Sequence, residues 1–270
     1  MPSKFKTTEI SDPQFESNNL RFITVKTPNL NGRGDICVFV PPFKTLKNLP
    51  IVTLLHGVYG SAWIWAHKAG VHFTALKMME AGLIKPMVIA MPSDGLWGDG
   101  SGYVPQTNAN YESWIVNDVV DAIIENIDCT SEASPLFISG LSMGGYGALR
   151  LGAKYTGKYS AISAHSSITN SNQMHLFVEE NESNYKQTDG TLEDVFQVIL
   201  QNKTNLPPLR FDCGKNDLLI EYNRSLHQNL VSKNIPHSYE EFEGAHEWPY
   251  WQEHVNDSLL FFNKHISKQA

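Results

Sequence analysis

Cysteine is scarce in this sequence, and its three copies, Cys37, Cys129 and Cys213, lie far apart without forming a C-x-x-C pair. A disulfide framework and a zinc ribbon both depend on several cysteines at characteristic spacings. Neither is therefore indicated. The scattered cysteines favour reduced thiols, and we expect a cytoplasmic protein.

Clustered positive charge and long apolar runs are also missing. Lys and Arg number 21 against 28 Asp and Glu, which gives a formal net charge of -7. A nucleic-acid surface needs clustered cationic side chains to neutralise phosphates, so no nucleic-acid partner is expected. Residues 1–9 lack the apolar region of a signal peptide, and no apolar run reaches the roughly 18 residues of a membrane span. We expect a soluble protein with no membrane partner.

Motifs for metals and nucleotides are absent as well. Residues 246–250, His-Glu-Trp-Pro-Tyr, do not match the H-E-x-x-H motif of zinc peptidases. The long loop at 93–110 contains several glycines and two aspartates, but no G-x-G-x-x-G and no calcium-loop spacing. We therefore expect neither a cofactor nor a metal.

Short apolar runs alternate with helical patterns after an initial pair of strands. The run Ile51–Leu55 is typical of a strand buried on both faces of a parallel sheet. The alternation predicts an α/β fold with a mostly parallel central sheet and helices on both faces. The predicted strands are 20–26, 35–40, 51–55, 86–92, 136–138, 159–165, 208–214 and 237–242, and the predicted helices are 73–82, 114–127, 146–151, 218–231 and 248–266.

No repeat or linker divides the chain. Its 270 residues and 41% hydrophobic content suit one α/β unit with a sizeable core. We predict a single domain over residues 1–270. Residues 170–205 are polar apart from a helical pattern at 192–200, and we expect them to form an insertion over the active site.

Ser142 lies in a sequence typical of a nucleophile elbow. Residues 140–144, Gly-Leu-Ser-Met-Gly, match G-x-S-x-G between the predicted strand 136–138 and helix 146–151. Glycine on each side allows the close approach of strand and helix that this sharp turn requires. The alternative is a glycine-rich connection in which the serine only caps the helix.

Two later strands end beside residues that complete a catalytic triad. Asp217 follows the strand 208–214, and His246 follows the strand 237–242. In α/β-hydrolases the acid and then the histidine follow the serine along the chain. A neutral imidazole accepts the serine proton, while the carboxylate orients the ring and stabilises its charged form. The order predicts Ser142, Asp217 and His246 as the triad.

Other roles remain open for the acid and the histidine. Asp217 could cap the following helix, and His246 could be an ordinary loop histidine. Asp212 is the nearest competing acid, although it lies within a predicted strand. His165, at the end of a neighbouring strand, is a competing histidine for the same cleft.

An oxyanion hole needs two donors that point to one position. The backbone amide of Met143, directly after the serine, is the first candidate. The amide of Val58 is the second, because His56-Gly57-Val58 directly follows an earlier strand. The alternative for this segment is a simple strand-ending turn.

Four aromatic residues lie in loops that we expect at the mouth of the site. Their rings could line an apolar or sugar-stacking pocket, or they could pack on the surface or in the core. They are Trp63, Trp65, Trp97 and Tyr103.

Four motifs in order along the chain resemble the esterase D, or putative-esterase, family of α/β-hydrolases, and within it the bacterial tributyrin-type esterases. The similarity extends from about residue 20 to the carboxy terminus. It implies a serine carboxylesterase with the triad and the two oxyanion amides given above. The motifs are Leu54–Gly60, Gly140–Gly147, Cys213–Asp217 and Gly244–Trp251.

The resemblance leaves the substrate open. The family also contains S-formylglutathione hydrolases, feruloyl and acetyl xylan esterases, and mycolyltransferases. This sequence has no cysteine near Val58, unlike the first, and no visible signal peptide or carbohydrate-binding module, unlike the secreted polysaccharide esterases. We expect hydrolysis of small acyl or aromatic-acid esters. The alternatives are acetyl or feruloyl esters of plant polysaccharides, S-formylglutathione-like thioesters, acyl transfer, or a non-catalytic binding protein. Whether the chain forms a homo-oligomer stays open.

Overall fold

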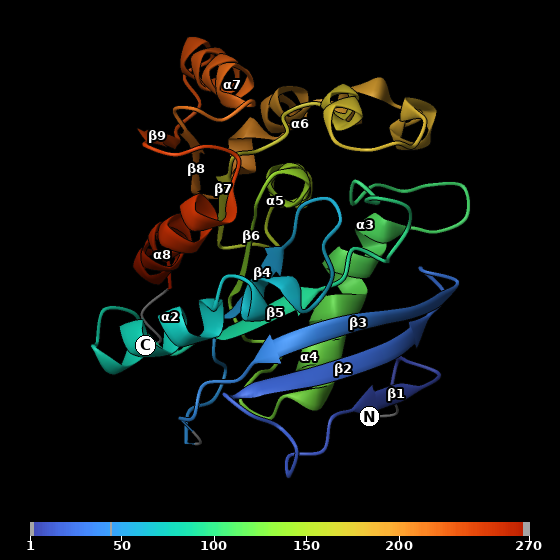
Figure 1. The fold of residues 1–270 in the computed structure, drawn as a ribbon, viewed down its shortest axis with the longest axis vertical. Helices are drawn as coiled ribbons and strands as arrows, with labels where there is room; N and C mark the ends of the chain where they lie inside the picture. The colour runs from blue at the N-terminus through green and yellow to red at the C-terminus, as the bar shows by residue number, and fades with distance from the viewer. Residues whose placement is uncertain (1–2, 44, 267–270) are drawn as a thin grey trace.

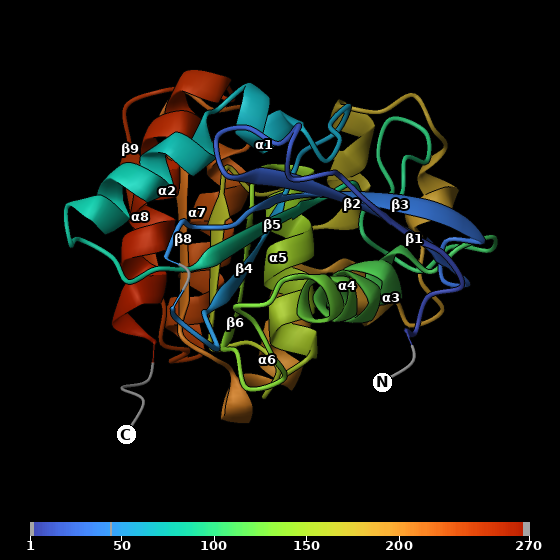
Figure 2. The same ribbon diagram turned by 90° about the horizontal axis from the view of Figure 1, so that it is seen from below.

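The computed structural model describes residues 3–43 and 45–266, which form a nine-stranded sheet with helices on both faces (Figure 1, Figure 2). The strand order is β1-β2-β3-β5-β4-β6-β7-β8-β9. Strands β1, β2, β3 and β5 pair antiparallel, and all pairs from β5 through β4 to β9 are parallel. The predicted α/β-hydrolase class, with its mostly parallel sheet, is confirmed.

The strands follow the predicted apolar runs closely. Ile51–Leu55 has the predicted bounds, and all five of its residues are buried. The strands are β1 Thr8–Ile10, β2 Leu20–Thr27, β3 Gly32–Phe39, β4 Ile51–Leu55, β5 Val88–Pro92, β6 Leu136–Gly140, β7 Ala161–His165, β8 Leu209–Gly214 and β9 Ser238–Phe242.

Each long predicted helix is present, and shorter helical turns join them. The α-helices are α1 Ile64–His67, α2 Val71–Glu80, α3 Tyr111–Ser113, α4 Val120–Asn126, α5 Met143–Lys154, α6 Val195–Gln201, α7 Ile220–Ser232 and α8 Trp248–Lys264. The other helical segments are the π-helical η1 Trp114–Val119 and the 3-10 segments η2 Ser171–Leu176, η3 Glu182–Tyr185, η4 Gly190–Glu193 and η5 Lys203–Asn205.

The core has two parts, one on each face of the sheet. Successive residues of a strand point to opposite faces, and Leu54 and Leu55 accordingly belong to different parts. Helices α1, α2 and α8 cover one face with Trp65, Ala75 and Phe262. Helices α4 to α7 contribute Ile123, Leu149, Val198 and Leu226 to the part on the other face. Figure 2 shows α4, α5 and α6 on that face.

Two features near the amino terminus differ from the prediction. The turn between β2 and β3 comes earlier than expected, so that Gly34 lies within β3 and pairs with Val25. A side chain at Gly34 would place its Cβ 2.5 Å from the Trp114 ring, so glycine is needed here for packing rather than for a turn. The short edge strand β1 was not predicted, because its sequence Thr-Glu-Ile has no apolar alternation.

The segment 170–205 contains η2 to η5 and α6. In the view of Figure 1 it lies above α5. Helix α6 packs between α5 and α7. The hydroxyl of Tyr185 donates to the Gly100 carbonyl at 2.9 Å, which joins the segment to the long loop 93–110. None of the helices that the structure describes combines the length and the apolar character that crossing a bilayer requires.

Candidate active site

Ser142 lies in a strained turn between β6 and α5. Its φ of 53° and ψ of -118° are sparsely populated for a residue with a side chain. A Cβ at Gly140 would lie 2.3 Å from the Gly144 carbonyl oxygen, and a Cβ at Gly144 would lie 2.4 Å from the Leu55 carbonyl oxygen. Only glycine fits at either position, as a nucleophile elbow requires.

Backbone hydrogen bonds hold this turn from both sides. The amide of Ser142 donates to the carbonyl of His165 at 3.0 Å, and the amide of Leu141 donates to the carbonyl of Leu55 at 3.3 Å. The Ser142 carbonyl accepts from Tyr146 and Ile168 at 3.0 and 3.2 Å. The serine is therefore fixed relative to β4 and β7.

The structure brings the three predicted triad residues together. The Ser142 hydroxyl lies 3.0 Å from Nε2 of His246, and Nδ1 of His246 lies 3.0 Å from both carboxylate oxygens of Asp217. In the tautomer that donates from Nδ1 to the carboxylate, Nε2 can accept a hydrogen bond from the serine hydroxyl. Ser142 and Asp217 are each only 2% exposed.

Asp217 also stabilises its own turn. Its Oδ1 accepts the Leu219 amide at 2.8 Å, and its own amide donates to the Gly214 carbonyl at 3.0 Å. This bond closes a turn before α7, whose N-cap is Leu219 without a side-chain cap, so Asp217 does not cap the helix in the way considered from the sequence. The backbone donor leaves the carboxylate little freedom to rotate away from the imidazole.

Two aromatic rings enclose His246. Phe177 stacks on the imidazole with ring centroids 5.1 Å apart, and Trp251 meets it edge-on at 4.9 Å. Phe177 was not among the candidates from the sequence. It lies in a polar segment whose position over the site depends on long-range contacts, and its only local signal was the apolar run Leu176–Val178.

The two predicted oxyanion amides lie in segments that border Ser142. A Cβ at Gly57 would lie 3.3 Å from the Cβ of Ser142, so the loop before Val58 passes directly beside the serine. The Met143 amide begins α5, where the first amides have no partner inside the helix. Among the described residues, neither the Val58 nor the Met143 amide donates to another protein group.

His56 anchors the loop that leads to Val58. This histidine is buried, and its Nε2 accepts the Asp94 amide at 3.1 Å while its Nδ1 contacts the Gly57 carbonyl at 2.6 Å. The hydroxyl of Tyr103 donates to the His56 carbonyl at 2.9 Å. The segment is thus more than a strand-ending turn, because it is tied to the loop 93–110.

The aromatic residues expected at the mouth have different environments. Trp65 and Tyr103 are buried in the core, where Trp65 donates to the Leu55 carbonyl at 3.0 Å, so the pocket-lining role is wrong for both. Trp97 packs edge-on against Tyr185 and borders a cavity of about 410 Å³ between the loop 93–110 and residues 183–188. Trp63 is 47% exposed.

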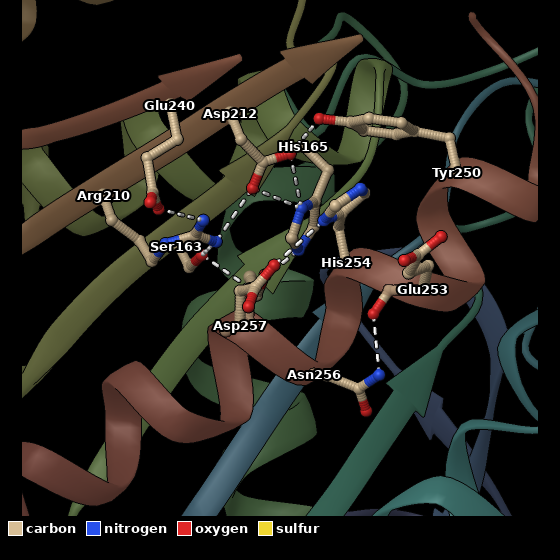
Figure 3. A network of polar contacts seen from close by, with 12 residues as sticks. Ser163, His165, Arg210, Asp212, Glu240, Tyr250, Glu253, His254, Asn256 and Asp257 are labelled. Atoms are coloured by element: carbon tan, nitrogen blue, oxygen red, sulfur yellow. Dashed lines mark hydrogen bonds and ion pairs between the residues drawn. The ribbon is translucent and has the colours of Figure 1, made fainter. Parts of the chain in front are cut away.

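The competing residues Asp212 and His165 pair with each other. Nδ1 of His165 lies 2.9 Å from Asp212, and Nε2 lies 2.7 Å from the Ser258 hydroxyl, beneath α8 (Figure 3). In the described chain, neither side chain hydrogen-bonds to Ser142 or His246.

No group of three or more His, Cys, Asp or Glu side chains within residues 3–43 and 45–266 is arranged to hold a metal ion.

Comparison with known families bears on this arrangement directly. The model of the family described as "Putative esterase" matches residues 27–262. This chain belongs to that family. The esterase is a carboxylic ester hydrolase, and the predicted family and enzyme class are both confirmed.

Three relatives illustrate the range of similarity to this esterase. An acetyl esterase of Caldicellulosiruptor saccharolyticus is 25% identical over 236 residues, which cover 81% of this chain and 85% of that one. A ferulic acid esterase structure has a TM-score of 0.78 at 20% identity and covers 98% of this chain and 100% of the other. An S-formylglutathione hydrolase of Staphylococcus aureus has a TM-score of 0.74 at 20% identity and covers 94% and 98%.

Proposed function

We propose that this esterase uses Ser142 as its nucleophile, His246 as its general base and acid, and Asp217 as the carboxylate that orients the histidine. The supporting observation is the row of hydrogen bonds from the Ser142 hydroxyl through His246 to Asp217, each 3.0 Å long. These contacts match the roles that acyl transfer to serine requires.

In the first half-reaction, Nε2 of His246 takes the proton from Ser142 while the serine oxygen attacks the ester carbonyl carbon. The carbonyl oxygen then carries negative charge, and we assign its stabilisation to the amides of Val58 and Met143. Collapse of this intermediate breaks the bond to the alcohol oxygen. Nε2 returns its proton to that oxygen, the alcohol leaves, and the acyl group stays on Ser142.

In the second half-reaction, water replaces the alcohol. Nε2 removes a proton from water as its oxygen attacks the acyl carbon, and the same two amides stabilise the charge. The bond to Ser142 then breaks, and the serine oxygen recovers a proton from the imidazolium. A carboxylic acid leaves, and the enzyme is restored without cofactor or metal.

We propose small acyl or aromatic-acid esters as the substrates. An alternative is an acetyl or feruloyl ester of a plant-polysaccharide fragment, which the acetyl esterase and ferulic acid esterase relatives favour. A second alternative is an S-formylglutathione-like thioester. Acyl transfer to another alcohol is less favoured, because it needs a cleft that excludes water.

We further propose that residues 1–270 form one domain in which 170–205 is an insertion over the active site. The stacking of Phe177 on His246 supports this placement.

A cytoplasmic location is supported by Cys37, Cys129 and Cys213, which are all free thiols. Fractionation of the producing cells tests the location.

The function is tested by assaying the wild type and Ser142→Ala on p-nitrophenyl acetate, butyrate and octanoate, beside methyl ferulate, acetylated xylo-oligosaccharides and S-formylglutathione. Turnover of only short p-nitrophenyl esters identifies a general short-chain esterase. Strong preference for ferulate or acetyl-sugar esters identifies a polysaccharide-directed enzyme. Wild-type-like turnover by Ser142→Ala on the preferred ester would contradict the proposed nucleophile.

A further inference from the structure

Asp212 is the centre of a buried charge network next to the catalytic loops. Its carboxylate is fully buried at the end of β8 and contacts three side chains from three different elements (Figure 3). Nδ1 of His165 on β7 and Nη1 of Arg210 on β8 each lie 2.9 Å from Oδ2. The hydroxyl of Tyr250 on α8 donates to Oδ1 at 2.8 Å.

The contact between Tyr250 and Asp212 joins a neutral phenol to a charged carboxylate. Burial alone would raise the pKa of Asp212, but His165, Arg210 and the Tyr250 hydroxyl hold it below its usual value. Burial and the neighbouring Asp212 charge raise the pKa of Tyr250, so its hydroxyl keeps the proton that it donates. Such a charge-assisted bond is stronger than one between neutral groups.

The ring of Tyr250 contacts the loop that carries His246. A Cβ at Gly244 would lie 2.7 Å from Cδ2 of Tyr250, and Gly244 has a φ of 136°, so glycine is required there. The Gly244 carbonyl accepts the Asn216 amide at 2.9 Å on its other side. The loop is thus enclosed between Tyr250 and the turn that carries Asp217.

The same network reaches the serine through the backbone. The carbonyl of His165 accepts the Ser142 amide at 3.0 Å, and the carbonyl of Asp212 accepts the Ser166 amide at 2.8 Å. Ser142 and the His246 loop are therefore both in contact with residues of one buried charge network. The side chain nearest to a Cβ at Gly244 is Tyr250, which also donates to Asp212.

We propose that Tyr250 is a positioning residue for His246, and that its hydrogen bond to Asp212 fixes the Gly244–Glu247 loop so that the imidazole lies between Asp217 and Ser142. The proposal rests on the proposed catalytic roles of these three residues. Tyr250 touches no reacting atom. Its effect on catalysis passes through the position of the loop. Catalytic groups must be held within roughly 0.5 Å of their productive geometry, so a small shift of the loop would misplace the imidazole.

The test compares Tyr250→Phe with Tyr239→Phe. Phenylalanine at 250 keeps the ring against Gly244 and removes the hydroxyl. Tyr239 is the matched control, because its hydroxyl also donates to a carboxylate, that of Glu241 at 2.9 Å. Its ring lies near the start of β9, where it packs against Phe211 and His227. All assays are made well below the lower thermal midpoint of the two variants.

Tyr250→Phe should lower kcat about tenfold and change KM less than about twofold, because misplacing a catalytic group mainly slows the chemical step. Inactivation by diisopropyl fluorophosphate should slow by a similar factor. This rate constant reports on folded enzyme alone, so partial unfolding does not obscure it. The downfield proton NMR signal of His246 Nδ1–H should shift or broaden in Tyr250→Phe and remain unchanged in Tyr239→Phe.

Wild-type values of kcat, inactivation rate and the proton signal in Tyr250→Phe would overturn the positioning role. Equal losses in Tyr239→Phe would also overturn it, because they would indicate general destabilisation. The proposed function has its own test: it is contradicted if Ser142→Ala retains turnover. An inactive Ser142→Ala together with a fully active Tyr250→Phe overturns the positioning role alone.

Discussion

The ring of Phe177 lies over the imidazole of His246, with 5.1 Å between their centroids and 30° between their planes. These residues come from the segment 170–205 and from the loop before α8. The Tyr59 hydroxyl donates to the Phe177 carbonyl, and the Glu179 amide donates to Asp99 at 3.0 Å. The segment is thus tied to two loops beside the proposed oxyanion amides, and Phe177 packs on the imidazole that we propose as the general base.

Replacing Phe177 with alanine should lower kcat/KM by about five- to tenfold, because the imidazole loses a stacked aromatic neighbour whose contribution is on the order of 1 kcal/mol. Steady-state kinetics on the best ester measure this effect. The matched control is Leu176→Ala, since Leu176 is the preceding residue and is 41% exposed. The stacking account is wrong when both variants behave alike.

Gly144→Ala should abolish most activity and destabilise the protein by about 1–3 kcal/mol, the usual cost of forcing extra atoms into a packed site. The added methyl group would meet the Leu55 carbonyl oxygen at 2.4 Å and displace the turn that holds Ser142. Urea unfolding and ester turnover measure the two effects. Gly190→Ala is the control, because a Cβ there has no atom within 4 Å, and it should match the wild type.

Glu112→Gln should change how stability depends on pH. The buried Glu112 carboxylate contacts Arg150 at 2.7 Å and Lys154 at 2.6 Å. Burial alone would raise its pKa, but these cations and the Tyr155 hydroxyl hold it below its usual value of 4.5. Its stabilising effect is therefore complete above that value and is lost as the pH falls through the lower folded pKa.

Urea unfolding of the wild type and Glu112→Gln at pH 7 and pH 3 measures this contribution. At pH 7 the variant should be less stable by about 3 kcal/mol, because the buried Arg150 loses its counter-charge. The difference should shrink at pH 3, because the Glu112 carboxylate of the unfolded chain takes up a proton below about 4.5, while the folded carboxylate has a lower pKa. A constant difference at both pH values would show that the ionisation of Glu112 does not support the fold.

The sequence predicted the sheet and the elbow because both depend on local patterns. A run such as Ile51–Leu55 can be stable only when both its faces are covered, and Gly140 and Gly144 match a turn that excludes side chains. Asp217 and His246 could be chosen from chain order, since parallel strands end at the same edge of the sheet.

Features that depend on distant contacts were not predicted. Trp65 and Tyr103 lie in segments that were expected to be loops, yet their rings are buried in the core. There the Leu55 and His56 carbonyls accept hydrogen bonds from Nε1 of Trp65 and from the Tyr103 hydroxyl. Phe177 stacks on His246, and Tyr250 packs against the Gly244 position of the same loop, through contacts between separate elements. Asp212 and His165 are of the same residue types as the acid and the histidine of the proposed triad. They could be set apart only by their contact with each other, which the structure shows.

The central claim is that Ser142 is the nucleophile, and the most direct test is to find which atom becomes covalently modified. Wild type and Ser142→Ala are treated with diisopropyl fluorophosphate and analysed by intact mass, peptide mapping and ester turnover. The wild type should gain one diisopropylphosphoryl group on Ser142, with release of fluoride, and lose activity in proportion. Ser142→Ala should stay unlabelled, and its kcat should be lower by about 10⁴-fold or more. Labelling of a different serine, or wild-type turnover by the folded variant, would contradict the account.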